Sequence, residues 1–471
     1  MSRRLYGVAV LIRQFMVAGL GHISALVADD ERGVAVVVDP RRDVDVYLRA
    51  AAESGWRISH VLETHLHNDY VSGGPELALL AGAQHVIGAR AEAAYPHMPV
   101  HDGDAFDLGA LRFSVLDTPG HTPEHVAYTL ADRSRTDDPL AVFSGGSLLV
   151  GAVGRTDLLG EANAQPYARA MFHSLHDRLL AQQDYVSVLP THGGGSLCSK
   201  DIATTPSSTI GYERRHNELL AIPEIEDFVR ALLTDQPAFP RYFARMRPIN
   251  KAGAAPLGTI AGPRALALPE VQALIAGDAL VIDARPHADY AAGHLPGSYS
   301  IPAGSSFGTW LGWVVPPDRP LVLVLESIDD WDGLLRQALR IGYDDVRGHL
   351  TSVADWRAAG LPLETGKRAT VDELAARLDG GPDAPLVIDV RQHYEYAEYH
   401  VPGSLHLMGG DLPDRLGELP RDKPIAAICR VGYRAAVAAG VLERAGFTNV
   451  TWVDGGVPAW RRAGYPVELG D

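Results

Sequence analysis

The stretch Glu63-Thr-His-Leu-His-Asn-Asp-Tyr70 follows directly on the apolar run Ile58–Leu62. This pattern predicts a buried strand that ends in a polar loop and delivers His65, His67 and Asp69 into that loop. Histidine is the commonest metal ligand in proteins, and residues two apart point the same way in an extended segment. The stretch therefore predicts a metal site at the edge of a sheet.

Two further histidines occupy the same kind of position. The apolar run Phe113–Leu116 leads to His121, and the run Val186–Leu189 leads to His192. If these strand ends share one edge of the sheet with the loop of His65, their side chains converge, as ligands do in layered α/β proteins. A chain with 19 histidines places some of them in loops by chance, but four just past strand ends favour a metal centre.

The surrounding residues predict a layered domain. Over residues 8–206, short apolar runs such as Val34–Val38 alternate with Gly/Asp/His-rich loops and with helix-like stretches such as Pro75–Ala81 and Gln165–Ala181. This alternation predicts strands and helices around a sheet, in an α/β or α+β arrangement. Residues 207–244 are predicted to be mainly helical, and residues 249–262, rich in Gly, Ala and Pro, to be a linker.

The ordered histidine set resembles the metallo-β-lactamase superfamily, whose marker is HxHxDH followed by later single histidines. The resemblance implies an αββα sandwich over residues 8–250 and the ligand set His65, His67, Asp69, His121 and His192.

Two shorter segments, Thr118-Pro-Gly-His-Thr122 and Gly154-Arg-Thr-Asp-Leu158, resemble the persulfide dioxygenases, an iron branch of that superfamily. This resemblance implies one Fe(II) ion, with Zn(II) as the alternative, and the oxidation of persulfides such as glutathione persulfide to sulfite.

Two residues depart from the family pattern. Tyr70 replaces the last histidine of HxHxDH, which removes a ligand of the second metal position and favours a single metal. In the dioxygenases an aspartate completes a site of two histidines, matched here by His65 and His121, and one carboxylate. Gly146 stands at the position of that aspartate. Metal occupancy therefore stays open, and an aspartate restored at Gly146 is expected to raise it.

The rest of the chain contains an internal repeat. Leu280-Val-Ile-Asp-Ala-Arg285 is matched by Leu386-Val-Ile-Asp-Val-Arg391, and similar pairs follow at an offset of 106 residues early and 104 late. Each copy alternates strands with helices, so two small parallel α/β domains are expected, over residues 262–364 and 369–471.

The second copy carries a cysteine loop, Cys429-Arg-Val-Gly-Tyr-Arg434, between the strand Pro424–Ile428 and an alanine-rich helix. Backbone N–H groups at a helix start stabilise a thiolate and form an anion-binding nest. The loop resembles that of the rhodanese sulfurtransferases, which implies that Cys429 carries sulfane sulfur. Arg434 is then a catalytic residue, and the anion-binding loop consists of Arg430, Val431, Gly432 and Tyr433.

The first copy keeps this frame without its chemistry, because Leu325 stands where Cys429 stands and Asp330 where Arg434 stands. It is predicted to be catalytically silent, with structural roles for Asp283, Arg285 and His294. Cys198, six residues after His192, is either a packed small residue or a neighbour of the metal site.

Composition limits the partners. The chain has 42 Lys+Arg against 58 Asp+Glu, a net charge of −16, which disfavours nucleic acid. The sequence has no apolar run of membrane-spanning length, and Arg13 and Gln14 interrupt its N-terminal apolar stretch, so neither a membrane span nor a signal peptide is expected. Two cysteines fit a reducing compartment, which predicts a cytoplasmic protein; a homodimer stays open.

These observations predict a fusion of a persulfide dioxygenase-like domain with an inactive and an active rhodanese domain. The expected substrates are low-molecular-weight thiols and persulfides, thiosulfate and sulfite. Two alternatives stay open for the first domain: a metal-dependent thioester or lactone hydrolase, and a non-catalytic domain that binds a thiol for use by Cys429.

Overall fold

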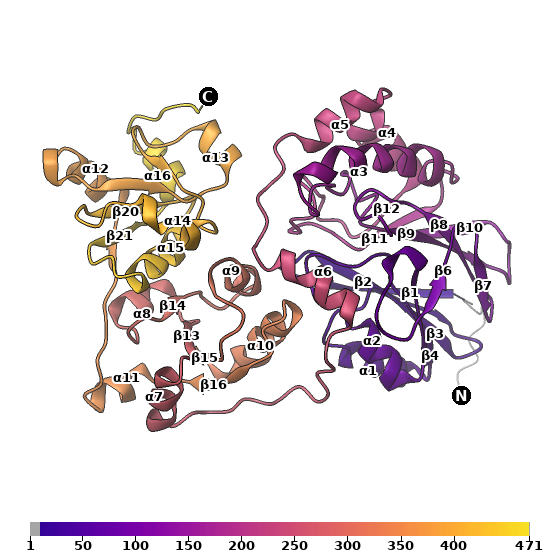
Figure 1. Ribbon diagram of the computed structural model, residues 1–471, viewed down its shortest axis with the longest axis horizontal. Coiled ribbons are helices and arrows are strands. Elements are labelled where there is room, and N and C mark those ends of the chain that lie inside the picture. Colours follow the sequence, from indigo (N-terminus) through magenta and orange to yellow (C-terminus); the bar gives the residue numbers. More distant parts are fainter. Residues whose placement is uncertain (1–9, 471) are drawn as a thin grey trace. The chain divides into compact units, whose positions relative to one another are not determined.

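A computed structural model describes residues 10–470 of the chain (Figure 1). The chain divides into two compact units. One ends at Ile260 and takes in Leu339–Gly342, and the other comprises the remaining residues from Ala261 onward. The predicted start of the first domain at residue 8, the basic N-terminal stretch of residues 1–9 and the final Asp471 lie outside the described residues.

The first unit contains two six-stranded sheets. The first sheet has the order β1-β2-β3-β4-β5-β6, antiparallel from β1 to β3 and parallel from β3 to β6. Its strands are β1 (Val10–Val17), β2 (His22–Asp29), β3 (Val34–Val38), β4 (Arg57–Leu62), β5 (Gln84–Gly88) and β6 (Met98–Val100).

The second sheet has the order β12-β11-β10-β9-β8-β7, in which β10 and β11 are parallel and the other pairs antiparallel. Its strands are β7 (Ala105–Leu108), β8 (Leu111–Asp117), β9 (Val126–Asp132), β10 (Pro139–Gly145), β11 (Ser187–Pro190) and β12 (Ser208–Thr209).

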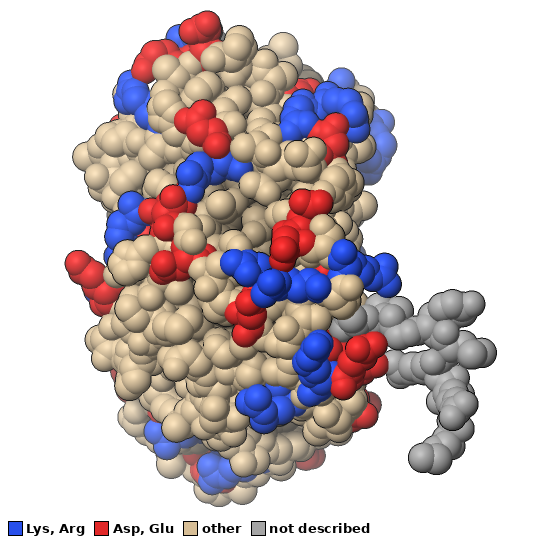
Figure 2. Space-filling view, turned by 90° about the vertical axis from the view of Figure 1, so that its right-hand side faces the viewer, with Lys and Arg blue, Asp and Glu red and all other residues tan. Residues whose placement is uncertain are grey.

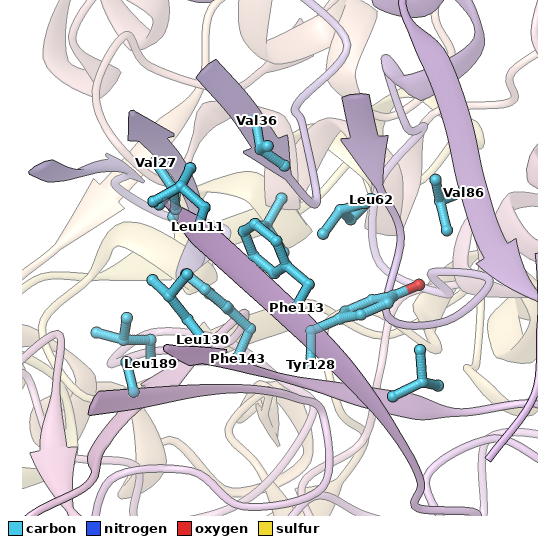
Figure 3. Close-up of a cluster of buried hydrophobic side chains, with 14 of the residues drawn as sticks. Val27, Val36, Leu62, Val86, Leu111, Phe113, Tyr128, Leu130, Phe143 and Leu189 are labelled. Atoms are coloured by element: carbon cyan, nitrogen blue, oxygen red, sulfur yellow. The ribbon is translucent and has the colours of Figure 1, made fainter. Parts of the chain in front are cut away.

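The two sheets face each other across a common core. Alternate residues of the strands point inward, so that Val36 and Leu62 of the first sheet approach Phe113, Leu130 and Phe143 of the second (Figure 3). Each of these side chains is at most 2% exposed. Burial of this apolar surface, at about 25 cal/mol per Å², is the main force that holds the sheets together.

Helices cover the outer face of each sheet. α1 (Asp45–Ser54) and α2 (Gly74–Ala81) place Tyr47 and Leu77 against the first sheet. The helices over the second sheet bury a separate cluster that includes Met171 and Phe228. These helices are α3 (Glu161–His173), α4 (Ile210–His216) and α5 (Ile225–Leu233), and α6 (Phe243–Ala252) follows them. The layers run helix, sheet, sheet, helix, which is the predicted αββα sandwich.

Two local expectations need correction. The helix predicted over residues 165–181 is α-helical only as far as His173. A short π-helical segment, Ser174–Leu179, follows it directly. The linker predicted to begin at residue 249 begins later, because α6 extends to Ala252. Asn250 holds this helix in place: its side-chain amide donates to the carbonyls of His67 and Tyr70, a tertiary contact that no local pattern signals.

The second unit contains both repeat copies. The first copy is a parallel sheet of order β14-β13-β15-β16 with strands β13 (Leu280–Asp283), β14 (Tyr299–Ser300), β15 (Leu321–Val324) and β16 (Val346–Leu350). Its helices are α7 (Leu268–Ala276), α8 (His287–Ala292), α9 (Phe307–Val314), α10 (Trp331–Arg340) and α11 (Val353–Ala358).

The second copy is a parallel sheet of order β17-β21-β20-β18-β19 with strands β17 (Lys367–Ala369), β18 (Leu386–Asp389), β19 (Leu405–His406), β20 (Ile425–Ile428) and β21 (Val450–Val453). Its helices are α12 (Val371–Leu378), α13 (His393–Glu398), α14 (Leu412–Arg415), α15 (Tyr433–Arg444) and α16 (Gly456–Arg462).

The two copies share local contacts at equivalent positions of the chain. Arg285 clamps Asp283 through hydrogen bonds of 2.9 and 2.6 Å, and Arg391 clamps Asp389 at the same distances. Leu325 directly follows β15 and Cys429 directly follows β20, as the repeat offset predicts. The Asp-x-Arg pairs therefore close a strand end in both copies, whether or not the copy carries a cysteine.

Within residues 10–470, no helix combines the length and the apolar composition needed to cross a bilayer. On the face drawn in Figure 2, acidic and basic side chains lie interspersed among neutral ones.

Candidate functional site

Three histidines from separate loops meet at one end of the sandwich. His65 follows β4 of the first sheet, whereas His121 and His192 follow β8 and β11 of the second. One ring nitrogen from each lies within 4.8 Å of the others, and all three residues are buried. The sequence-based expectation of a single shared sheet edge is wrong: the ligands converge because both sheets end at the same edge of the sandwich.

The second ring nitrogen of His65 and of His121 forms a hydrogen bond, whereas that of His192 lies close to a carboxylate without a hydrogen bond. His65 Nδ1 lies 2.8 Å from Thr64 Oγ1, and His121 Nδ1 lies 2.8 Å from the carbonyl of Arg155. His192 Nδ1 faces Asp69 Oδ2 at 3.2 Å. The Nε2 atom of each ring is buried without a hydrogen-bond partner in the described chain. Buried polar atoms are almost always paired, so these adjacent ring nitrogens fit the ligands of a metal ion.

Asp69 lies against a candidate metal ligand, His192. A carboxylate on the far nitrogen of a histidine sets its tautomer and raises its basicity as a ligand. Although burial by itself raises the pKa of Asp69, the nearby His192 lowers it below its usual value, which keeps the carboxylate ionised. The site thus has a negative charge behind His192.

His67 is turned toward two acids behind the site. Its Nε2 lies 2.9 Å from Glu63 Oε2 and 3.3 Å from Asp39 Oδ1. Burial disfavours its charged form, but these carboxylates outweigh burial and raise the pKa of His67 to about 10. Its Nδ1 is buried without a partner in the described structure, and His67, Asp69 and His192 form a second group able to hold a metal. His67 therefore belongs to a different candidate metal-binding group from His65 and His121.

Asp39 organises these loops and was missed by the sequence analysis. It directly follows β3 and accepts hydrogen bonds from the backbone N–H of Thr64 at 2.7 Å, from the Thr64 hydroxyl and from the Thr191 hydroxyl. It thereby ties the loop of His65 to the loop of His192. Its place just past an apolar strand is the signal that revealed the histidines, and the same signal could have revealed Asp39.

The position of Gly146 is closed to a side chain. A Cβ atom added there would overlap Cδ2 of His121 and lie 2.8 Å from its Cγ. Gly154, in the segment shared with the dioxygenases, similarly packs against the carbonyl of Gly146. The His121 ring therefore occupies space next to residue 146 that an aspartate would need.

His125 is another buried histidine that the sequence analysis overlooked. Its Nε2 accepts a hydrogen bond from the backbone N–H of Gly146 at 2.9 Å, and its ring stacks on His65 with centroids 4.9 Å apart. Tyr70 is also fully buried, and its ring stacks on His67. Both rings fill space beside the three-histidine group, so the loops are packed firmly around it.

We expect the metal-free first domain to lose stability as the pH falls from 7 to 5. Burial lowers the pKa of His22 and His121 to about 3, and it lowers the pKa of His65 and His125 well below the usual 6.5. Below about 6.5 the unfolded chain then binds more protons, and each such histidine costs about 1.4 kcal/mol per pH unit.

His67 offsets only a small part of this loss. It stays protonated in the folded chain over the whole range, so it adds stability only until the unfolded chain also binds this proton, near pH 6.5. Thermal unfolding of chelator-treated protein at several pH values tests the prediction. A melting temperature that stays constant or rises on acidification would contradict it.

The cysteine loop lies at the end of β20. Cys429 is buried, and its Sγ accepts a hydrogen bond from the backbone N–H of Gly432 at 3.1 Å. Such a donor stabilises negative charge on sulfur. Gly432 has φ 106°, a left-handed conformation that favours glycine, and it directly precedes α15. Arg430 and Val431 are exposed, so the predicted anion-binding loop has a solvent-facing edge.

Arg434 is paired within the protein. Its guanidinium donates to both carboxylate oxygens of Glu395, with Nη2–Oε1 at 2.8 Å and Nη1–Oε2 at 2.5 Å. Although burial by itself raises the pKa of Glu395, Arg434 lowers it below its usual range, so the pair is ionised. Glu395 was not predicted. Its charge compensates the positive charge of Arg434.

Cys198 lies beside the metal site but is not activated there. It is fully buried, and burial, followed by the charge of Asp69, raises the pKa of its thiol well above the usual value. Its backbone carbonyl accepts a hydrogen bond from Arg155 N at 2.9 Å. The thiol therefore stays protonated, and Cys198 acts as a packed small side chain.

In the silent copy, Leu325 is fully buried where the other copy has Cys429. A cavity of about 370 Å³ beside it is lined by Arg285, Leu325, Glu326 and Arg357, among others. This cavity has no thiol in its wall.

Comparison with known proteins agrees with this architecture. Residues 18–180 match the metallo-beta-lactamase superfamily, and residues 268–359 and 370–463 each match the rhodanese-like domain. A metallo-beta-lactamase structure from Staphylococcus aureus covers 72% of this chain and 98% of its own, with a TM-score of 0.65 and 30% identity. The chain belongs to the metallo-beta-lactamase superfamily and carries two rhodanese-like domains after that domain, as predicted.

Within the superfamily, the chain is homologous to the persulfide dioxygenases. The persulfide dioxygenase ETHE1 of Bos taurus is 30% identical over 232 residues, which are 48% of this chain and 82% of that protein. A hydroxyacylglutathione hydrolase from a Methylobacterium species is 35% identical over 136 residues, or 28% of this chain and 51% of that protein. The ETHE1 homology and the rhodanese domains support enzyme-like domains, a metal site and a role in sulfur metabolism.

Proposed function

We propose that this protein processes sulfane sulfur on small thiols, in two coupled activities. Cys429 accepts and transfers the sulfur, and the first domain, with a metal ion bound, would oxidise persulfides of the glutathione persulfide class to sulfite with O2 as the oxidant. The observation that carries the proposal is the hydrogen bond from Gly432 N–H to Cys429 Sγ at the start of α15. Because both activities lie on one chain, the product of one is supplied to the other at a raised effective concentration.

At Cys429 the loop performs two tasks. The N–H of Gly432 stabilises the sulfur anion before and after transfer. The ion pair of Arg434 with Glu395 holds the first turn of α15 against α13, because both its hydrogen bonds link these helices. In thiosulfate transfer, the Cys429 thiolate attacks the outer sulfur, the S–S bond of thiosulfate breaks, and sulfite leaves with the bonding electrons.

In the first domain, His65, His121 and His192 are the proposed metal ligands. Their free Nε2 atoms fit a metal ion, and Asp69 holds His192 in the required tautomer. Fe(II), when bound, would supply the redox chemistry that joins oxygen to persulfide sulfur. A 2.9 Å hydrogen bond between the buried His67 and Glu63 holds the loop after β4 in place.

One observation favours a second candidate for the first domain. The proposed set consists of three neutral histidines because Gly146 supplies no carboxylate, and three histidines with an open position are also a catalytic zinc set. A zinc-bound hydroxide attacks carbonyl carbon, so the domain would then hydrolyse a thioester or lactone.

Elemental analysis combined with two assays on the full chain separates these functions. We expect about one iron per chain, oxygen uptake with glutathione persulfide, and one added sulfur atom on the Cys429 peptide after treatment with thiosulfate. Zinc together with hydrolysis of a glutathione thioester would establish the hydrolase instead. Protein prepared with excess metal that nevertheless binds none would favour a thiol-binding first domain. A Cys429 peptide that gains no sulfur atom would overturn the transferase function.

A further inference from the structure

His287 and His393 stand at the same place in the two repeat copies. Each lies two residues after the arginine of the Asp-x-Arg pair, and each begins a helix, α8 or α13. His393 is exposed, as this position predicts for a helix start at the surface. His287 is half-buried, because the second copy packs against it inside the same compact unit. One sequence position therefore has two different environments.

The side chain that His287 contacts across the two copies is Tyr433 of the cysteine loop. The ring centroid of His287 lies 5.1 Å from that of Tyr433, edge to face, and 6.0 Å from that of Trp452. Tyr433 follows Gly432, the residue whose N–H contacts Cys429 Sγ. His287 thus reaches the sulfur-transfer loop from the silent copy.

A helix of the silent copy supports the same loop. Trp310 of α9 lies 6.3 Å from the Tyr433 ring, centroid to centroid. Trp313 packs so closely on Gly410 that a Cβ atom there would overlap its ring. The two copies are consequently fitted together at the active loop, and Gly410 permits the close approach.

Two polar atoms in this contact have no partner. His287 Nδ1 is bound to Ser300 Oγ at 2.8 Å, whereas His287 Nε2 and the Tyr433 hydroxyl are buried without a hydrogen bond to any described residue. Burial lowers the pKa of His287 to about 4, so the ring is neutral near pH 7. Leaving one such group unsatisfied costs about 1–3 kcal/mol, which points to a ligand that satisfies both.

The cysteine loop also has neutral donors within reach. Arg434 uses two of its N–H groups on the oxygens of Glu395, and this carboxylate compensates its charge. An oxygen-bearing anion beside Cys429 therefore gains from additional donors. The Tyr433 hydroxyl is one, and His287 Nε2 is another in the tautomer whose Nδ1 accepts from the Ser300 hydroxyl.

We propose that His287 of the silent copy and Tyr433 of the active loop bind the oxygen atoms of an oxyanionic sulfur donor such as thiosulfate. The silent copy then determines donor specificity, and this role rests on the proposed sulfur transfer at Cys429. During transfer the S–S bond of thiosulfate breaks, sulfite leaves with the electron pair, and Cys429 keeps the outer sulfur as a persulfide. The two side chains hold the oxygens of thiosulfate and of the departing sulfite equally.

The test uses His287→Phe and Tyr433→Phe in the full chain, because a phenyl ring preserves the packing and removes one polar atom. We expect each variant to raise the KM for thiosulfate about tenfold at an unchanged kcat, since a hydrogen bond to a charged ligand is lost in ground and transition states alike. Glutathione persulfide lacks the sulfonate oxygens, so the kinetic constants of His287→Phe with this donor should stay as in the unmodified protein. Tyr433 lies in the cysteine loop itself, so Tyr433→Phe is compared by the ratio of its losses with the two donors.

His393→Phe is the matched control, because it makes the same change at the equivalent exposed position. A KM for thiosulfate within twofold of the unmodified value would overturn the proposal, and so would an equal loss with both donors, which would indicate a merely structural role. Failure of the unmodified protein to transfer sulfur from either donor would instead refute the transferase function itself.

Discussion

Replacing Cys429 with serine is expected to abolish sulfur transfer while leaving the fold intact. Serine nearly matches the size of the buried thiol, and its hydroxyl can still accept the hydrogen bond from Gly432, but it cannot carry a persulfide. Loss of a nucleophile that forms the covalent intermediate typically costs about 10⁴-fold or more in turnover. The measurement is thiosulfate:cyanide sulfur transfer by the purified full chain.

The matched control is Cys198→Ser. That thiol is buried beside Asp69 with its pKa raised, so we expect the variant to keep full transfer activity. A Cys429→Ser protein that retains transfer, or a Cys198→Ser protein that loses it, would show that the sulfur-carrying residue has been misassigned.

Introducing an aspartate by Gly146→Asp is expected to weaken metal binding. The resemblance to the persulfide dioxygenases alone suggests the opposite, because it implies a carboxylate ligand at this position. In the structure, however, a Cβ atom at Gly146 would overlap the His121 ring, so the new side chain must displace a proposed ligand. Disturbing the surroundings of a metal ligand commonly costs about 10–100-fold in affinity, and displacing the ligand itself should cost at least as much.

The measurement is competition for Fe(II) or Zn(II) against a chromophoric chelator, with circular dichroism as a check on folding. Gly262→Asp provides the control, because it adds the same charge where the structure leaves space around the Cβ position. An increase in metal affinity in Gly146→Asp would contradict this prediction. It would show that the His121 ring moves aside and that the new carboxylate serves as a ligand.

The sequence revealed the architecture because its signals are local or periodic. Apolar runs that end in His65, His121 and His192 marked three strand ends, and the repeat offset placed Leu325 opposite Cys429 before any coordinates were considered. The cysteine loop between a strand and a helix was equally visible. Such patterns are visible in the sequence because the backbone geometry of strands and helices places residues of one kind at fixed spacings along the chain.

Features that join distant segments could not be read in this way. The sequence did not reveal that the ligands come from two sheets, or that Asp39 ties Thr64 to Thr191. It also gave no sign that Glu395 compensates Arg434. Each of these contacts depends on where separate loops meet and on the direction of each side chain.

The sequence by itself therefore determined which residue types are available and the strand ends and loops that carry them. Only the tertiary structure decided which of their atoms are free to react. His287 and His393 show the difference most clearly: they share one repeat position, but only His287 is buried against the Cys429 loop. The physical reason is that burial and hydrogen bonding depend on three-dimensional neighbours, and packing of the two copies, rather than local sequence, sets those neighbours.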